Sequence, residues 1–289
     1  MIISSSPVAV KKMSPIRVRS KRPSAGPKVS AVIITYNEEQ NIRRTLSQLY
    51  WCDEVVIVDS HSTDNTVAIC QEFGCEVYFK KFEGYGEQKR FAVAKASNDW
   101  VLCIDADEVL TEKLVWEITE ELSSGTSYSG FSIPMNLMFL NKEFTRGRES
   151  GRHFLRLFNK LHGGFTDDKV HESIKVDGQV KKLQHIIRHY SHTNLHQCLD
   201  KCNRYSTTSA EMAFSKGKNK SLFAVVFGLP FNFFKYYIIE RNFLNGLKGF
   251  YWAMFSTYYH FAKYIKIREL QETVQSRTLN YSNEHPLMA

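Results

Sequence analysis

The chain has 289 residues, 43% of them hydrophobic, and a formal net charge of +8. This length allows one large domain or two smaller ones with a sizeable core, and the charge favours an anionic partner such as phosphate, anionic lipid or nucleic acid. The six cysteines form no Cys-x-x-Cys pair, which argues against a zinc site and favours reduced, structural thiols.

The first 28 residues form a segment of a different composition. They hold seven Lys or Arg and no acidic residue, among several Ser and Pro. Such a composition is typical of a disordered basic tail. The tail either touches a membrane surface or is a solvated extension, and it lacks the apolar core of a secretory signal.

Strands and helices alternate after the tail. Apolar runs predict strands at 29–35, 54–58, 76–79 and 100–104, with helices through 42–49, 67–70 and 87–96 between them. Asn37 is a suitable N-cap for the first helix. Strands that alternate with helices indicate an α/β fold with a mostly parallel sheet built from right-handed βαβ units.

The second half of the chain changes character. We expect a helix at 111–122, strands at 130–134, 154–158 and 184–190, and helices rich in aromatic residues from 196 onward. The apolar segment 221–234 is short for a membrane span and contains Pro230, while 243–267 interleaves Lys with Tyr, Trp and Phe. Three interpretations stay open: a pair of interfacial helices, an ordinary packed helical subdomain, or a true span.

Two carboxylates follow the fourth predicted strand. Asp105 and Asp107 lie in Ile104-Asp105-Ala106-Asp107-Glu108, directly after the apolar run 100–103. Carboxylates at the carboxyl end of a strand lie where α/β proteins bind ligands, and hard oxygen ligands suit Mg²⁺ or Mn²⁺. The alternative is a solvated acidic turn.

Polar residues also follow the first two strands, at 35–38 and 59–64. A dinucleotide-binding fold would show Gly-x-Gly-x-x-Gly after the first strand, but this turn is Tyr36-Asn37-Glu38-Glu39. The missing glycines argue against a nicotinamide oxidoreductase. An acidic turn suits hydrogen bonds to a base or ribose, with the diphosphate held by a metal ion near Asp105 and Asp107.

These residues together resemble family 2 glycosyltransferases of the GT-A fold. The resemblance covers residues 29–270, and the motifs that carry it are Val32-Ile33-Ile34-Thr35-Tyr36-Asn37-Glu38-Glu39, Val58-Asp59-Ser60-His61-Ser62-Thr63-Asp64-Asn65-Thr66 and Asp105-Ala106-Asp107-Glu108. Within that family the chain is most similar to lipopolysaccharide-core glucosyltransferases, through Gly84-Tyr85-Gly86-Glu87-Gln88-Lys89-Arg90-Phe91-Ala92, Leu155-Arg156-Leu157-Phe158 and Phe165-Thr166-Asp167-Asp168-Lys169-Val170-His171-Glu172. Two positions depart from the pattern, because His61 and Asn65 stand where glycine is usual.

The resemblance implies a role for each matching position. Tyr36 and Asp59 would contact the nucleotide base and Glu38 the ribose. Asp105 would touch the ribose or metal-bound water, and Asp107 would bind the metal. The remaining candidates have two readings each: Lys89 and Arg90 face the diphosphate or solvent, His171 is a metal ligand or a structural group, and Arg156 is a phosphate or acceptor contact or a structural one.

Inverting transfer needs one general base opposite the leaving group. Glu172 is the first candidate, followed by Asp168 and Asp167. The alternative is that these acids are charges of a surface loop, since they follow Gly163-Gly164.

The sequence thus predicts a tail at 1–28, a GT-A domain at 29–195 and a membrane-associating helical region at 196–289. The expected activity is metal-dependent transfer of a sugar, with UDP-glucose as the donor implied by the resemblance, to a lipid-linked acceptor such as the inner-core heptose of lipopolysaccharide. We expect the enzyme at the cytoplasmic face of the inner membrane, with no nucleic acid partner. The alternatives are the same chemistry on a capsule or exopolysaccharide precursor, and a non-catalytic module that binds membranes or nucleic acid.

Overall fold

The computed structural model describes residues 26–166, 173–217 and 222–284. The described chain divides into two compact units, and two segments of the sequence contribute to each. Unit 1 holds the residues up to Ser132 and Leu155–Leu183, and unit 2 holds Ile133–Phe154 and the residues from Gln184 onward.

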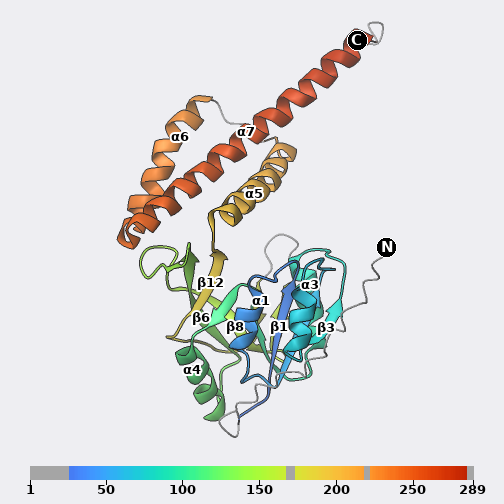
Figure 1. Cartoon of the computed structure of the whole chain (residues 1–289), viewed down its shortest axis with the longest axis vertical. Helices are drawn as coiled ribbons and strands as arrows, with labels where there is room; N and C mark the ends of the chain where they lie inside the picture. The colour runs from blue at the N-terminus through green and yellow to red at the C-terminus, as the bar shows by residue number, and fades with distance from the viewer. Residues whose placement is uncertain (1–25, 167–172, 218–221, 285–289) are drawn as a thin grey trace, which may run out of the picture. The chain divides into compact units, whose positions relative to one another are not determined.

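Unit 1 is built around a mostly parallel sheet with the strand order β3-β2-β1-β4-β8 (Figure 1). The first four strands are parallel, and β8 pairs antiparallel with β4. The strands are β1 (Val29–Thr35), β2 (Glu54–Asp59), β3 (Glu76–Phe79), β4 (Trp100–Cys103) and β8 (Arg152–Asn159), of which residues from Leu155 belong to unit 1.

Helices flank this sheet because its central strands are apolar on both faces. Val32, Val56, Val58 and Val101 form one buried cluster with Ala92 of α3. Their neighbours in the strands are buried as well, and they point to the opposite face by the alternation of a strand. The helices of unit 1 are α1 (Ile42–Ser47), α2 (Thr66–Glu72), α3 (Tyr85–Lys95) and α4 (Glu112–Ser123).

Short strands complete unit 1. Residues 163–165 and 174–176 form a separate antiparallel pair of strands, and residues 180–182 pair parallel with residues 130–132. These strands are β5 (Glu108–Leu110), β9 (Gly163–Phe165), β10 (Ile174–Val176), β11 (Val180–Lys182) and the start of β6 (Gly130–Phe139).

Unit 2 combines a small sheet with helices. The later residues of β6 pair with β7 (Lys142–Glu143) and with β12 (Ile187–His192). Phe139, Phe144 and Trp252 pack edge to face here, together with buried Cys198. The helices are α5 (Leu195–Ser215), α6 (Leu222–Phe234), the π-helix η1 (Lys235–Ile239), the 3-10 helix η2 (Asn242–Asn245) and α7 (Leu247–Glu284). Among the described residues, no helix is both long and apolar enough to cross a membrane.

The structure confirms the predicted mixed α/β fold, in which a mostly parallel sheet is flanked by helices. The alternation of strands and helices from residue 29 to 104 is as predicted, and the last predicted strand is shifted to Ile187–His192. One local prediction is wrong: Asn37 is not the N-cap of the first helix. Asn37 has a φ of 55°, and the helix begins at Ile42 with Asn41 before it.

The six cysteines are free thiols, and burial raises the pKa of several of them. The pKa rises to about 12 for Cys70 and Cys75 and to about 11 for Cys103, because the thiolate loses its hydration. These thiols are therefore structural.

Candidate active site

The carboxyl ends of β1 and β2 meet at Thr35 and Asp59, which are partners in the parallel register. Asp59 is fully buried, and its carboxylate accepts hydrogen bonds from the Thr35 hydroxyl at 2.7 Å, the Ser62 backbone N–H at 2.7 Å and the Ser62 hydroxyl at 2.6 Å. These three bonds offset the cost of burying the carboxylate. Asp59 therefore fixes the turn that follows β2.

The turns after β1 and β2 are joined to each other. The Asn37 backbone N–H donates to the Ser62 hydroxyl at 2.9 Å, and the Asn37 side-chain oxygen accepts from the Thr63 backbone N–H at 2.8 Å. Both turns contain a residue in the left-handed region, Asn37 at φ 55° and His61 at φ 65°. His61 thus adopts a conformation that glycine takes at no cost, whereas Asn65, at φ −80°, does not.

The two predicted nucleotide contacts of the first turn lie at this edge of the sheet. Tyr36 is 57% exposed, so its ring is accessible for stacking. The Glu38 backbone N–H donates to the Thr66 hydroxyl at 2.8 Å, and the Glu38 carboxylate accepts from the Asn41 amide at 2.9 Å. These bonds order the turn that would face the ribose.

The densest charge cluster of the site surrounds Asp105, directly after β4. One carboxylate oxygen of Asp105 lies 3.1 Å from the Lys89 ammonium, and the other lies 3.2 Å from the Arg156 guanidinium. Arg156 also forms an ion pair with Glu108, whose other oxygen accepts the Asp105 backbone N–H at 3.1 Å. We call these four residues, Lys89, Asp105, Glu108 and Arg156, the charge network.

Three members of the charge network are withdrawn from solvent, and Asp105 is partly open. The side chain of Asp105 is 34% exposed, whereas those of Lys89 and Arg156 are largely covered and that of Glu108 is buried. Burial alone would lower the pKa of Lys89, but the Asp105 carboxylate raises it above its usual value. Burial likewise opposes the charge of Arg156, and the carboxylates of Glu108 and Asp105 raise its pKa. Both cations therefore stay charged at neutral pH.

Asp107 lies between Asp105 and Glu108 of the charge network in the sequence and is 9% exposed. The backbone between the two aspartates is held from α1, because the Thr45 hydroxyl donates to the Ala106 carbonyl at 2.7 Å. Both oxygens of Asp105 face cations, and Asp107 stays the candidate metal ligand that the resemblance implies.

The donor set fits a hard cation that is shared with a substrate. Within the described ranges, no three side chains of His, Cys, Asp or Glu gather into a group that would hold a metal ion by themselves. Mg²⁺ commonly binds one or two carboxylates and completes its shell with water and substrate phosphates. Asp107 fits that arrangement, in which the diphosphate supplies further oxygen ligands.

Arg90, the next residue along α3, has its own partners. Its guanidinium lies 2.7 Å from the Glu87 carboxylate and donates to the Thr166 carbonyl at 2.8 Å. Arg90 is thereby held beside Thr166, and a direct contact with a diphosphate stays a prediction.

The remaining predicted site residues, Asp168, His171 and Glu172, lie outside the described residues. Among the described candidates, Lys89 and Asp105 are in contact, and Tyr36, Glu38, Asp59 and Asp107 follow three parallel strands at one edge of the sheet. The sequence analysis did not identify Glu108 as part of the site. The apolar pair Val109-Leu110 after it was the available signal, because it indicates a buried strand rather than a solvated turn.

This edge has the chemical requirements for binding an anionic leaving group. It carries two largely covered cations, one partly open carboxylate between them and an exposed aromatic ring. Fixed charges in a partly buried site stabilise developing charge more strongly than water does.

Comparison of the sequence with known proteins identifies the family to which the chain is similar. Residues 30–176 match the family model described as Glycosyl transferase family 2. An uncharacterized glycosyltransferase of Rickettsia conorii is 35% identical over 258 residues, which cover 85% of this chain and 90% of the relative. The lipopolysaccharide core biosynthesis glycosyltransferase LpsC of Rhizobium meliloti is 31% identical over 246 residues, which cover 83% of this chain and 91% of the relative.

A solved structure is also similar to part of the chain. It is glucosyl-3-phosphoglycerate synthase from Mycobacterium tuberculosis in complex with Mn²⁺, UDP and glucosyl-3-phosphoglycerate. The match covers 38% of this chain and 44% of that chain at 25% identity, with a TM-score of 0.34.

Proposed function

Because the chain belongs to glycosyltransferase family 2, we propose that it transfers a hexosyl group, with inversion, from a nucleoside diphosphate sugar to a hydroxyl of a lipid-linked glycan. The observation that carries the proposal is the charge network. In it, the cations of Lys89 and Arg156 flank Asp105, and Asp105 precedes Asp107 by two residues. The donor's nucleotide would lie along the edge formed by the turns after β1, β2 and β4.

The leaving diphosphate is the group that most needs stabilisation. A divalent ion, Mg²⁺ or Mn²⁺, would be held by Asp107 and would neutralise the charge that develops on the diphosphate. Lys89 holds Asp105 from one side and Arg156 holds it from the other, so the Asp105 carboxylate keeps one orientation toward the ribose or the water shell of the ion. Tyr36 stacks on the base, Asp59 orders the turn beside it and Glu38 faces the ribose.

The acceptor must lose a proton as it attacks. The acceptor oxygen forms a bond to the anomeric carbon, the bond from that carbon to the diphosphate oxygen breaks, and the acceptor proton passes to a carboxylate. We assign this base to Glu172, with Asp168 as the alternative. His171, which lies between Asp168 and Glu172 in the sequence, would orient the base or complete the metal shell.

Two observations support a glycolipid of the lipopolysaccharide inner core as the acceptor. The relative from Rhizobium meliloti has a name in lipopolysaccharide core biosynthesis, and the match extends over most of both chains. The net charge of +8 suits a phosphorylated glycolipid. The donor proposed with it is UDP-glucose, and the proposed location is the cytoplasmic face of the inner membrane, where nucleotide sugar and lipid-linked acceptor meet.

The test is product formation from a panel of substrates. The protein is incubated with each common nucleotide sugar, with Mg²⁺ or Mn²⁺, and with lipopolysaccharide truncated to its inner core or with a capsule precursor. A sugar added to the truncated lipopolysaccharide supports the proposal. Transfer to the capsule precursor alone replaces the acceptor, and no transfer from any donor contradicts the proposal.

A further inference from the structure

Helix α6 turns an apolar face to solvent. Every exposed side chain that the structure describes in this helix is apolar: Val226, Phe227, Pro230, Phe231 and Phe234. Phe227, Phe231 and Phe234 follow the i, i+4, i+7 spacing of one helical face, and Phe231 is 61% exposed. A soluble helix normally places polar residues on such a face, so an exposed apolar row of this kind marks an interaction surface.

Helix α7 has a similar row in its first part. Leu247, Tyr251, Met254, Tyr258 and Ile265 are all exposed, and their spacing places them on one side of the helix. Leu247, at the turn from η2, is 64% exposed. Helices α6 and α7 form the two arms of a helical hairpin, and each arm thus carries a row of exposed apolar side chains.

Other residues hold the two arms together. Phe233 of α6 packs against Phe250 of α7 with ring centres 5.6 Å apart, and Tyr237 of η1 packs against Phe250 at 5.8 Å. The exposed rows are therefore a surface of the hairpin and not its interior.

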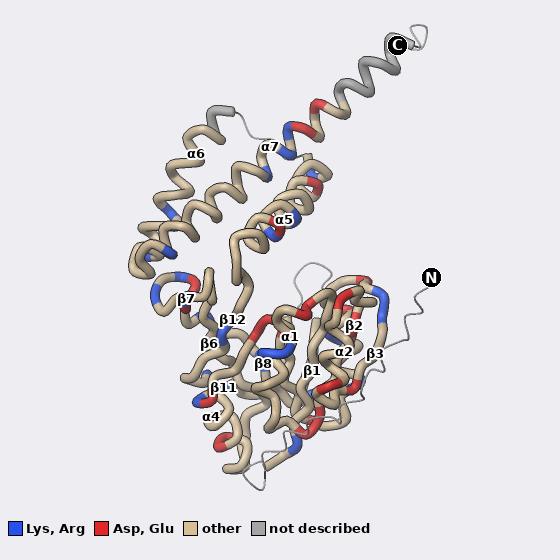
Figure 2. The backbone as a smooth tube through the Cα atoms, in the orientation of Figure 1, with Lys and Arg blue, Asp and Glu red and all other residues tan. Residues whose placement is uncertain are grey.

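Nearly all charged residues of this hairpin are positive. Residues 222–268 contain six Lys or Arg and a single acidic residue, Glu240. Glu240 is buried and forms an ion pair with Arg148 at 2.6 Å, so it does not offset the surface charge. No described residue forms an ion pair with Lys235, Arg241, Lys248 or Lys263, and Figure 2 locates the blue segments along the hairpin.

We propose that the hairpin formed by α6, η1, η2 and α7 up to Arg268 binds the surface of an anionic lipid bilayer. The apolar rows enter the boundary between headgroups and acyl chains, and the lysines extend their ammonium groups to lipid phosphates. Tyr and Trp side chains favour this depth because they are apolar with a polar tip. The inference deepens the proposed function, on which it rests for the identity of the membrane that carries the acceptor.

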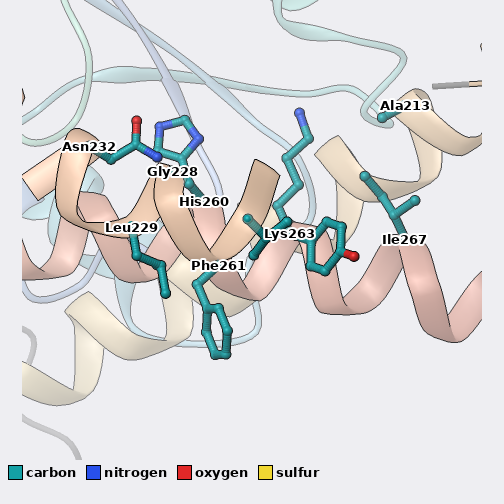
Figure 3. A pocket seen from close by; sticks show the side chains of 10 residues that line it. Ala213, Gly228, Leu229, Asn232, His260, Phe261, Lys263 and Ile267 are labelled. Atoms are coloured by element: carbon teal, nitrogen blue, oxygen red, sulfur yellow. The ribbon is translucent and has the colours of Figure 1, made fainter. Parts of the chain in front are cut away.

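A small hollow within unit 2 fits the same partner. It measures about 150 Å³ and lies among α5, α6 and α7. Figure 3 shows Asn232 and His260 toward one end of the hollow and Ala213 and Ile267 toward the other, with Lys263 extending from α7. The walls are mostly apolar, and Asn232, His260 and Lys263 add polar groups, a combination that suits the upper part of an acyl chain and its phosphate.

Vesicle sedimentation tests the proposal with the full chain. The protein is mixed with phosphatidylcholine vesicles with and without phosphatidylglycerol, in the absence of donor and acceptor. One variant combines Phe227→Ser and Phe231→Ser, and a second combines Lys235→Gln and Lys248→Gln. Trp116→Ser and Lys113→Gln, at exposed positions on α4 in unit 1, are the matched controls.

We expect the wild type and both controls to sediment with the anionic vesicles. The phenylalanine variant should lose at least about tenfold in partitioning, because apolar area no longer leaves water. The lysine variant should lose roughly fivefold per cation, and only on anionic vesicles.

Two results would overturn the proposal. Unchanged sedimentation of the phenylalanine variant would place membrane binding elsewhere in the chain, for example in residues 1–28. A dimer in analytical ultracentrifugation that the same variant abolishes, without vesicle binding by the wild type, would assign the surface to a second copy. Neither result depends on sugar transfer, so the failure of the proposed function remains distinguishable.

Discussion

The carboxylate of Asp105 lies 3.2 Å from the guanidinium of Arg156, although the two residues are 51 positions apart in the sequence. Arg156 extends from β8 and Asp105 follows β4, and these two strands are antiparallel neighbours. The pairing of the strands thus brings a buried cation to the end of β4, where Asp105 and Glu108 would otherwise repel each other.

Removing this cation should destabilise the protein. Arg156→Met leaves the buried Glu108 without its partner, and we expect the free energy of unfolding to fall by about 3–5 kcal/mol. Chemical denaturation followed by circular dichroism measures the change. Arg43→Met is the matched control, because its ion pair with Glu72 is exposed and should contribute less than about 1 kcal/mol. Equal losses in both variants would contradict the assigned role of Arg156.

The pair of Lys89 and Asp105 predicts a specific dependence on pH. The pKa of Lys89 is raised above its usual 10.5, so the stability that it contributes is complete below that value and is lost as the pH rises through the folded-state pKa. The difference in unfolding free energy between the wild type and Lys89→Met should stay constant from neutral pH to roughly pH 10 and shrink above it. Lys113→Met controls for the loss of an exposed lysine, and a difference that persists unchanged at higher pH would refute the pairing.

If Glu172 is the general base, its loss should lower the rate of sugar transfer without weakening the binding of the donor nucleotide. Glu172→Gln should lower kcat for sugar transfer by roughly 10²–10⁴-fold while the affinity for UDP changes little, since the base acts on the acceptor side. Steady-state kinetics and UDP titration calorimetry give the two quantities. Asp168→Asn is the companion variant, and a larger kcat loss there would transfer the role to Asp168.

The basic tail distinguishes an enzyme from a binding module. Deleting residues 1–28 should leave sugar transfer to a soluble acceptor fragment unchanged within about twofold. The reason is that β1 begins at Val29 and every proposed site residue lies after it in the sequence. Initial rates of nucleotide release measure the effect. If transfer activity disappeared on deletion while the core stayed folded, the tail would be part of the working site.

Much of unit 1 is predictable from sequence for a local reason. The strands from Val29 to Cys103 are mostly apolar runs separated by helices and turn residues, so their type and their order along the chain follow from the pattern. The short strand β5 was not predicted, because its only signal is the apolar pair Val109-Leu110 and three residues are too few to show a period. The site is also only partly predictable. Asp105 and Asp107 are recognisable at a strand end, whereas the cations that pair with Asp105 are brought there by the tertiary fold.

The roles of Arg156 and Lys89 could not be predicted from the residue pattern of the sequence. From the sequence, Arg156 is a phosphate or acceptor contact or a structural group, and the structure places it against two carboxylates of its own chain. Lys89 had a solvated helix face as one interpretation, yet its side chain is largely covered beside Asp105. In both cases a long-range contact decides the role, and spacing along the chain does not encode that contact.

Metal-dependent release of nucleotide is the most direct test of the central claim that Asp107, beside the charge network, holds the divalent ion that neutralises the leaving diphosphate. The wild type is compared with Asp107→Asn and with Asp99→Asn, an exposed carboxylate at the opposite end of β4. We expect UDP release that requires Mg²⁺ or Mn²⁺ and acceptor, that persists in Asp99→Asn and that falls by at least about 10³-fold in Asp107→Asn. Release that is independent of metal, or equal in the two variants, would contradict the account.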